Sequence, residues 1–213
     1  MVVKIHGMNM STCTKRVLMT CHELGVEYEL NLVDLFKGEQ KAPEFVANFQ
    51  PFGAVPVLVD EDGTQIYESR AIARYLVAKY GKDSTLVPSP SDPKAYGLFE
   101  QAASIEYSSF DPLVSGIYRE NLFSRLESRE PDSTLIEKYH QTLLEKLEAY
   151  ERILSKQKYL GGDVFTLADL FHIQYGKGVE GYLPGIFDSQ PNVKRWWADI
   201  TARDSWKALA DLK

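Results

Sequence analysis

Hydrophobic and polar positions follow two different patterns along the chain. Over about the first 80 residues, short strand-like runs alternate with helix-like stretches. Val2–His6 and Tyr28–Val33 are typical of strands, and apolar residues between them recur every three or four positions, as on one face of a helix. Gly25 stands where that helix should end in a left-handed cap. The pattern predicts a strand–helix–strand unit with a right-handed crossover.

A second set of elements follows in the same stretch. The polar residues 37–51 predict a loop with a short irregular helix. The apolar runs Val55–Asp60 and Gln65–Tyr67 flank an Asp-Gly pair, which favours a hairpin. A helix should then begin at Glu68–Ser69 and end at Gly81. Two kinds of strand connection in so short a stretch predict a small mixed sheet with helices.

The pattern changes after a segment of linker composition. Residues 81–93 are rich in Pro, Ser and Gly, and everything beyond them has a helical pattern. That pattern is interrupted near Asp111–Pro112, because proline kinks or ends a helix. We therefore expect an α/β domain over residues 1–81, a linker over 82–92 and an all-α domain over 93–213.

One helix of the second half begins with a capping box. Thr166 is an N-cap candidate and Asp169 follows three residues later, with Phe165 and Leu170 at the positions of a hydrophobic staple. We interpret this motif as structural, since a cap contributes about 1 kcal/mol to stability. His172 in the same helix is interpreted as a packed residue.

Composition and charge exclude several classes of protein. The chain has 213 residues and a net charge of −6, the wrong sign for binding nucleic acid or an anionic membrane. No apolar run approaches the roughly 18–20 residues of a membrane span, and no export signal is visible, so we expect a cytoplasmic location. Cys13 and Cys21 fall in one predicted helix, about 12 Å apart, which is too far for a disulfide. No His or Cys cluster has metal-ligand spacing, so no metal is expected.

The first candidate for chemistry is Ser11, where the first strand meets its helix. In one interpretation Ser11 is only an N-cap. In the other, its hydroxyl donates a hydrogen bond to a bound anion such as a thiolate, which lowers the pKa of that thiol. The helix N-terminus would favour the same negative charge.

Two further segments could hold a ligand. Pro56 begins a strand either as a trans-proline at an edge or as a cis-proline that turns the Val55 backbone towards an extended ligand. Glu68 and Ser69 open a helix, where they could bind the ammonium and carboxylate groups of a ligand. Lys41 lies in a polar stretch and could pair with another carboxylate.

In their order and spacing, these segments resemble the cytosolic glutathione transferases, and the resemblance covers the whole chain. It is carried by Ser11, by Pro-Phe-Gly-Ala-Val-Pro at residues 51–56, by Glu-Ser-Arg-Ala-Ile at 68–72 and by the capping box. The Ser11–Val17 start, residues 37–41 and Phe110–Pro112 look most like the phi class of plants and fungi.

The resemblance implies a thioredoxin-like N-terminal domain that binds glutathione as co-substrate, an all-helical C-terminal domain and a homodimer. It implies conjugation of glutathione to hydrophobic electrophiles in detoxification, with reduction of organic hydroperoxides as a further activity. The site residues that it implies are Ser11 for the thiolate, Val55 before cis-Pro56 for the cysteinyl part, Glu68 and Ser69 for the γ-glutamyl end, and Gln40 and Lys41 for the glycine carboxylate.

Two positions depart from the family pattern. Gln40 stands where the family often has His, and Ala54 where it often has Gln. Gln40 can still donate a hydrogen bond, whereas Ala54 cannot. We therefore expect a weaker affinity for glutathione, seen in KM before kcat.

The resemblance places the electrophile in an apolar pocket between the domains. Phe36 and Phe123 are the first candidates by position. Each candidate also fits ordinary packing, since aromatic residues make up 12% of the chain. The full set is Met10, Phe36, Tyr107, Tyr118 and Phe123.

The sequence is also compatible with other functions. The chain could be a ligandin that binds apolar or aromatic compounds without turnover. Cys13, in the first helical turn, could support thiol transfer, although its helical phase favours a buried structural role. An interaction domain would have no need of Ser11 or Glu68–Ser69, and a serine hydrolase would need an elbow such as G-x-S-x-G, which is absent from the sequence.

Overall fold

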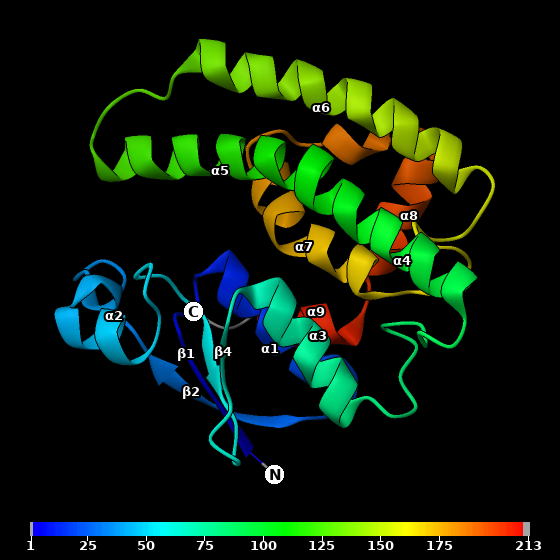
Figure 1. Cartoon of the computed structure of the whole chain (residues 1–213). Helices are drawn as coiled ribbons and strands as arrows, with labels where there is room; N and C mark the ends of the chain where they lie inside the picture. Colours follow the sequence, from blue (N-terminus) through cyan, green and yellow to red (C-terminus); the bar gives the residue numbers. More distant parts are fainter. Residues whose placement is uncertain (1, 211–213) are drawn as a thin grey trace. The chain divides into compact units, whose positions relative to one another are not determined.

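The structure is a computed structural model that describes residues 2–210. Its contacts divide the chain into two compact units, one mostly N-terminal with a sheet and helices, the other helical (Figure 1). The expected class, a small mixed α/β domain followed by an all-helical domain, is confirmed.

The first unit is built on a four-stranded sheet in the order β2-β1-β3-β4. β1 pairs in parallel with β2, with Val2 opposite Glu27, and antiparallel with β3, which pairs antiparallel with β4. The parallel pair follows from the helical crossover between β1 and β2, and the antiparallel pair from the hairpin. The strands are β1 (Val2–Gly7), β2 (Glu27–Leu32), β3 (Val57–Val59) and β4 (Gln65–Tyr67).

Helices pack on this sheet. α1 and α3 lie side by side (Figure 1), and Phe49, which caps the C-terminus of α2, packs its ring at a tilt against His6 of β1. α1 ends at Gly25, whose φ of 63° is the left-handed cap that the sequence predicts. The helical segments are α1 (Thr12–Leu24), the 3₁₀ turn η1 (Glu39–Lys41), α2 (Pro43–Asn48) and α3 (Ser69–Tyr80).

A buried carboxylate ties the β3–β4 hairpin to α3. Asp60 is 4% exposed and accepts hydrogen bonds from the hydroxyls of Tyr75 at 2.5 Å and Tyr80 at 2.6 Å, and from Lys79 Nζ at 2.8 Å. Lys79 also contacts Asp62, in the turn, at 2.6 Å. Since all three donors come from α3, the cluster fixes this helix against the hairpin.

The second unit is a bundle of helices around α7 (Leu167–Glu180). α7 is buried on nearly all sides and packs against α4, α5 and α8, as a helix at the centre of a bundle must. A π-helical segment, Glu106–Phe110, lies before Pro112, so the expected interruption takes the form of a widened turn. The other elements are α4 (Pro93–Ile105), α5 (Asp111–Leu126), α6 (Ser133–Leu154), the 3₁₀ turn η3 (Ile186–Asp188) and α8 (Pro191–Thr201).

The predicted capping box at the start of α7 is confirmed. Asp169 Oδ2 accepts from the backbone N–H of Thr166 at 3.1 Å, and the reciprocal bond is present. Asp169 is fully buried and also accepts from Leu160 N and Trp196 Nε1, so the box joins α7 to α8. His172 is buried as expected, between the Tyr150 hydroxyl at 2.9 Å and the Ala168 carbonyl at 2.7 Å.

The C-terminal segment differs from the expected domain division. The contacts group the described residues up to Leu86 with those from Arg203 onward, and leave Val87–Ala202 as the second unit. α9 (Asp204–Ala210) packs on α1, because Arg203 pairs with Glu23 at 2.6 Å and Ser205 donates to the same carboxylate. This ion pair joins residues 180 positions apart, so no local pattern predicts it.

In the part of the chain that the structure describes, no helix is both long and apolar enough to span a membrane. Within residues 2–210, no group of three or more His, Cys, Asp or Glu residues is placed so that it could bind a metal ion.

Candidate functional site

Ser11 is the N-cap of α1. Its Oγ accepts a hydrogen bond from Thr14 N at 3.2 Å, so the capping role is present. A hydroxyl has one donor and two acceptor sites, and capping uses only an acceptor site. Among the described residues, no acceptor is seen for the Ser11 proton. Ser11 can therefore cap the helix and donate to a ligand at the same time.

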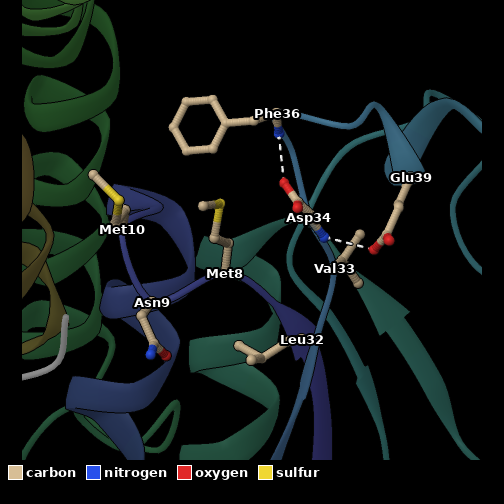
Figure 2. A pocket seen from close by; sticks show the side chains of 8 residues that line it. All are labelled: Met8, Asn9, Met10, Leu32, Val33, Asp34, Phe36 and Glu39. Carbon is tan, nitrogen blue, oxygen red and sulfur yellow. Dashed lines mark hydrogen bonds between the residues drawn. The ribbon is translucent and has the colours of Figure 1, made fainter.

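A pocket of about 390 Å³ lies beside this helix start. Met10 and Phe36, predicted to contact a hydrophobic substrate, both line it, and their side chains are 57% and 60% exposed. Figure 2 shows Met8, Met10 and Phe36 extending towards the same space. The residues that line the pocket are Met8, Asn9, Met10, Leu32, Val33, Asp34, Phe36 and Glu39.

The loop before β3 has the cis form of the Val55–Pro56 bond, so the cis prediction is confirmed. Pro56 is buried and Val55 half-buried. Gly53, three residues earlier, has a φ of 60°, and a Cβ there would lie 2.8 Å from the Gln40 carbonyl. Only glycine fits this close approach of the two loops.

Gln40 and Lys41 lie in η1, against that loop. Lys41 Nζ donates to the Phe52 carbonyl at 2.9 Å, and the lysine remains exposed. Gln40 Oε1 is buried without a hydrogen-bond partner among the described residues. A buried, unpaired acceptor is costly, which makes Gln40 Oε1 a candidate to accept a hydrogen bond from a ligand.

Glu68 and Ser69 begin α3 in an unusual backbone conformation. Glu68 has φ 71° and ψ 107°, a region that non-glycine residues rarely occupy. Such strain persists where the surrounding structure imposes it, and it clusters at ligand sites. Glu68 is exposed, whereas Ser69 is 5% exposed.

A buried arginine joins this helix start to α1. Arg16 has no exposed surface, and its Nη1 donates to Ser69 Oγ at 2.8 Å. The same Nη1 lies 3.7 Å from Cys13 Sγ. Sequence reasoning missed Arg16, because one charged residue on a helix gives no sign that it is buried. Cys13 is a free thiol and only half-buried, so the buried position that its helical phase favours is not reached, whereas Cys21 is buried.

The predicted substrate residues of the second unit have different environments. Tyr107 is 64% exposed and Phe123 is 48% exposed. Tyr118 packs edge-on against Tyr175 and Tyr182, and burial raises the pKa of its phenol. Tyr118 therefore has the packing role that sequence reasoning left open beside substrate contact.

Sequence reasoning also missed six of the eight described residues that line the pocket: Met8, Asn9, Leu32, Val33, Asp34 and Glu39. Met8 and Asn9 precede the predicted helix, and Asp34 and Glu39 follow the second strand. The signal that could have found them is the β1–β2 pairing, because Gly7 lies opposite Leu32 and the residues after both strands then meet at one edge of the sheet.

Comparison with known proteins assigns the chain to a family. Residues 10–79 match the family model for the N-terminal domain of glutathione S-transferases, and residues 110–204 match the model for the C-terminal domain. Glutathione S-transferase PM239X14 of Arabidopsis thaliana is 60% identical over 92% of this chain and 90% of its own length.

Comparison with solved structures supports the same family assignment. Glutathione transferase F7 from Populus trichocarpa has a TM-score of 0.92 and 35% identity, covering 98% of each chain. Maize glutathione S-transferase I, solved in complex with an atrazine glutathione conjugate, has a TM-score of 0.90 and 28% identity, covering 99% of this chain and 97% of the maize chain. The chain therefore belongs to the glutathione S-transferase family, and it is a glutathione transferase similar to the phi class, with glutathione as its co-substrate.

Proposed function

We propose that this glutathione transferase activates the thiol of glutathione at Ser11 and transfers it to hydrophobic electrophiles bound in the pocket beside it. The observation that carries the proposal is the Ser11 hydroxyl, which caps α1 through a lone pair and keeps its proton for a ligand. A free thiol has a pKa near 8.5, so little thiolate exists at neutral pH. A donated hydrogen bond and the N-terminal end of α1 both stabilise the thiolate.

The chemistry needs no covalent enzyme intermediate. The thiolate sulfur attacks the electrophilic carbon, a carbon–sulfur bond forms, and the bond to the leaving group breaks, so that the leaving group departs with the electron pair. The proton of the thiol goes to solvent before the attack. The maize protein that holds an atrazine glutathione conjugate supports the same class of reaction for this chain.

The rest of glutathione would lie along the residues that flank Ser11 in the fold. The exposed Glu68 carboxylate suits the γ-glutamyl ammonium, and Ser69, held by Arg16, suits the γ-glutamyl carboxylate. The Val55 backbone before cis-Pro56 would pair with the cysteinyl part. Lys41 and the Nε2 donor of Gln40 would bind the glycyl carboxylate, and the unpaired Oε1 of Gln40 would accept a hydrogen bond from an N–H of the ligand.

Met10 and Phe36 are the proposed contacts to the electrophile in the first unit. Tyr107, Tyr118 and Phe123 stay predictions for the second unit. Reduction of organic hydroperoxides would use the same activated thiolate. Its sulfur attacks a peroxide oxygen, the O–O bond breaks, the alcohol leaves after protonation, and glutathione sulfenic acid is formed; the thiol of a second glutathione then attacks this sulfur to give glutathione disulfide and water.

A thiol transferase is the second candidate function, because Cys13 is partly exposed and lies 3.7 Å from the Arg16 guanidinium. Its thiolate would attack a glutathione mixed disulfide, displace the other thiol and be regenerated by glutathione. A third candidate function is that of a ligandin, which binds apolar or aromatic compounds without turnover.

The first experiment is the rate of glutathione conjugation to 1-chloro-2,4-dinitrobenzene, for the protein and for Cys13→Ser. We expect a rate well above that of the uncatalysed reaction and equal rates in the two proteins, since Ser11 and not Cys13 supports the thiolate. A rate no higher than the uncatalysed one, in a protein still retained on immobilised glutathione, would favour the ligandin. Loss of turnover in Cys13→Ser would favour thiol transfer.

We further propose that the enzyme works in the cytoplasm as a homodimer. Its two free thiols suit a reducing compartment. Phe52 is 73% exposed with its ring edge-on to Tyr67, while its backbone N–H and carbonyl are bound by Gln50 and Lys41. A rigidly held, exposed aromatic pair is typical of a protein interface, and a second copy of the chain is the proposed partner.

Phe52→Ser should therefore weaken the dimer by at least tenfold in dissociation constant, because a buried aromatic anchor at an interface contributes about 2 kcal/mol or more. Sedimentation over a range of protein concentrations would measure it. Val164→Ser, which removes another apolar residue, one that is 50% exposed, is the matched control and should leave the association unchanged. A monomeric parent protein would contradict the proposal.

A further inference from the structure

We propose that the pocket beside Ser11 selects uncharged aromatic electrophiles and disfavours anionic ones, with Glu39 as the main determinant. This inference rests on the proposed function, since it names the class of substrate that the same pocket accepts. The proposal is based on the two kinds of side chain that line the pocket: apolar, polarisable side chains and acidic ones.

The apolar part suits an aromatic ring. Two thioethers, Met8 and Met10, and the ring of Phe36 extend towards the same space, with Leu32 below them (Figure 2). Thioether sulfur makes favourable contacts with aromatic rings, and methionine adapts its shape to different ligands. An electron-poor ring could thus lie between the sulfur atoms and Phe36.

The acidic part is built from the two ends of one turn. Asp34 N donates to Glu39 Oε2 at 2.7 Å, which holds the Glu39 carboxylate at the pocket (Figure 2). Asp34 Oδ1 accepts from Phe36 N at 3.0 Å and from Lys37 N at 3.2 Å. Both carboxylates are therefore fixed by backbone contacts.

The two charges differ in how well they are compensated. Lys37 Nζ lies 3.2 Å from Asp34 Oδ2, and the hydrogen bond from this lysine lowers the pKa of Asp34, so its carboxylate is ionised at neutral pH. Glu39 has no ion-pair partner among the described residues. The eight described residues that line the pocket include these two carboxylates and no Lys or Arg. An anionic substrate would meet an uncompensated negative charge.

The test compares two probes that share a ring and a leaving group, 4-chloro-3,5-dinitrobenzamide and 4-chloro-3,5-dinitrobenzoate. The kcat/KM of each is divided by its uncatalysed rate constant with glutathione, and the selectivity is the ratio of the amide value to the carboxylate value. Bound glutathione is itself anionic and repels the carboxylate probe, so it raises this selectivity ratio in the parent protein and in every variant. The informative quantity is therefore the change in the ratio on substitution.

Glu39→Gln should lower the ratio about three- to tenfold, because one unit charge a few ångströms away at the protein surface has an effect of this size. Gln can still accept the hydrogen bond from Asp34 N, so the turn is kept. Asp34→Asn should lower the ratio less, since Lys37 already compensates that charge. Added salt should lower the ratio of the parent protein more than that of Glu39→Gln.

Glu44→Gln is the matched control, because Glu44 is exposed at the start of α2 and does not line the pocket. It should leave both the rates and the ratio unchanged. An unchanged ratio in Glu39→Gln would overturn the proposal.

If neither probe is conjugated, the proposed function fails while the charge selection is still decided by binding. Equilibrium dialysis of the two probes without glutathione then gives the ratio of their dissociation constants. Tighter binding of the amide, reduced in Glu39→Gln, supports the selection. Equal affinities overturn it.

Discussion

Ser11→Ala should lower kcat/KM for glutathione conjugation by about 10²- to 10³-fold, the usual effect of removing one donor to a developing or bound anion. The apparent pKa of the reaction should rise towards that of a free thiol, near 8.5, because the variant no longer stabilises the thiolate. The pH dependence of the rate measures both effects. Turnover should fall relative to the parent most strongly below pH 7, where the thiolate fraction depends most on its environment.

Loss of the cap is a competing explanation, since Ser11 Oγ also accepts from Thr14 N. Its removal should reduce the stability of the protein by about 1 kcal/mol. Ser11→Asp separates the two roles, because a carboxylate caps a helix as well as serine does but cannot donate to a thiolate and repels it. We expect this variant to keep the stability and lose the activity. If Ser11→Ala were fully active and Thr12→Val were impaired, the hydroxyl of Thr12, and not that of Ser11, would donate the hydrogen bond to the thiolate.

Asp60→Asn should lower the free energy of unfolding at pH 7 by about 3 kcal/mol, as expected when one partner of a buried ionic cluster is removed. Lys79 and the hydroxyls of Tyr75 and Tyr80 would lose a shared carboxylate at 2.5–2.8 Å. For a chain of this size, the melting temperature should fall by about 6–12 °C. Urea denaturation measures the change directly.

The effect of this substitution should depend on pH. Burial alone would raise the pKa of Asp60, but hydrogen bonds from Lys79, Tyr75 and Tyr80 outweigh it and lower the pKa well below the ordinary value. The hydrogen bond from Lys79 likewise lowers the pKa of Asp62 to about 2. A carboxyl whose pKa is lowered on folding stabilises the protein above its unfolded pKa, near 3.9, and loses this effect as the pH falls.

The stability difference between the parent protein and Asp60→Asn should therefore be constant above about pH 5 and shrink as the pH falls from about 4 to 2. Asp83→Asn is the control, because Asp83 is exposed, and it should match the parent throughout. A difference that stays constant down to pH 2 would mean that the carboxylate charge contributes nothing to this cluster.

Local patterns in the sequence predicted most elements of the fold. Gly25 ends α1 and the Thr166–Asp169 box begins α7, because both depend on backbone groups within a few residues. The strands near the N-terminus and the hairpin follow from alternation and the Asp-Gly turn. The motifs around Ser11, Pro56 and Glu68 also sufficed to identify the family.

The tertiary structure determined which residues from different elements come into contact. Arg16 is buried because Ser69, 53 residues later, receives its hydrogen bond, and Asp60 collects three donors from a helix that begins nine residues beyond it. The acidic side of the pocket exists because the parallel pairing of β1 and β2 places the turn after β2 next to the residues after β1. The sequence by itself determined the local conformations and the family, because these depend on neighbouring residues. Burial, charge compensation and the lining of the pocket depend on contacts between distant residues, which only the folded chain brings together.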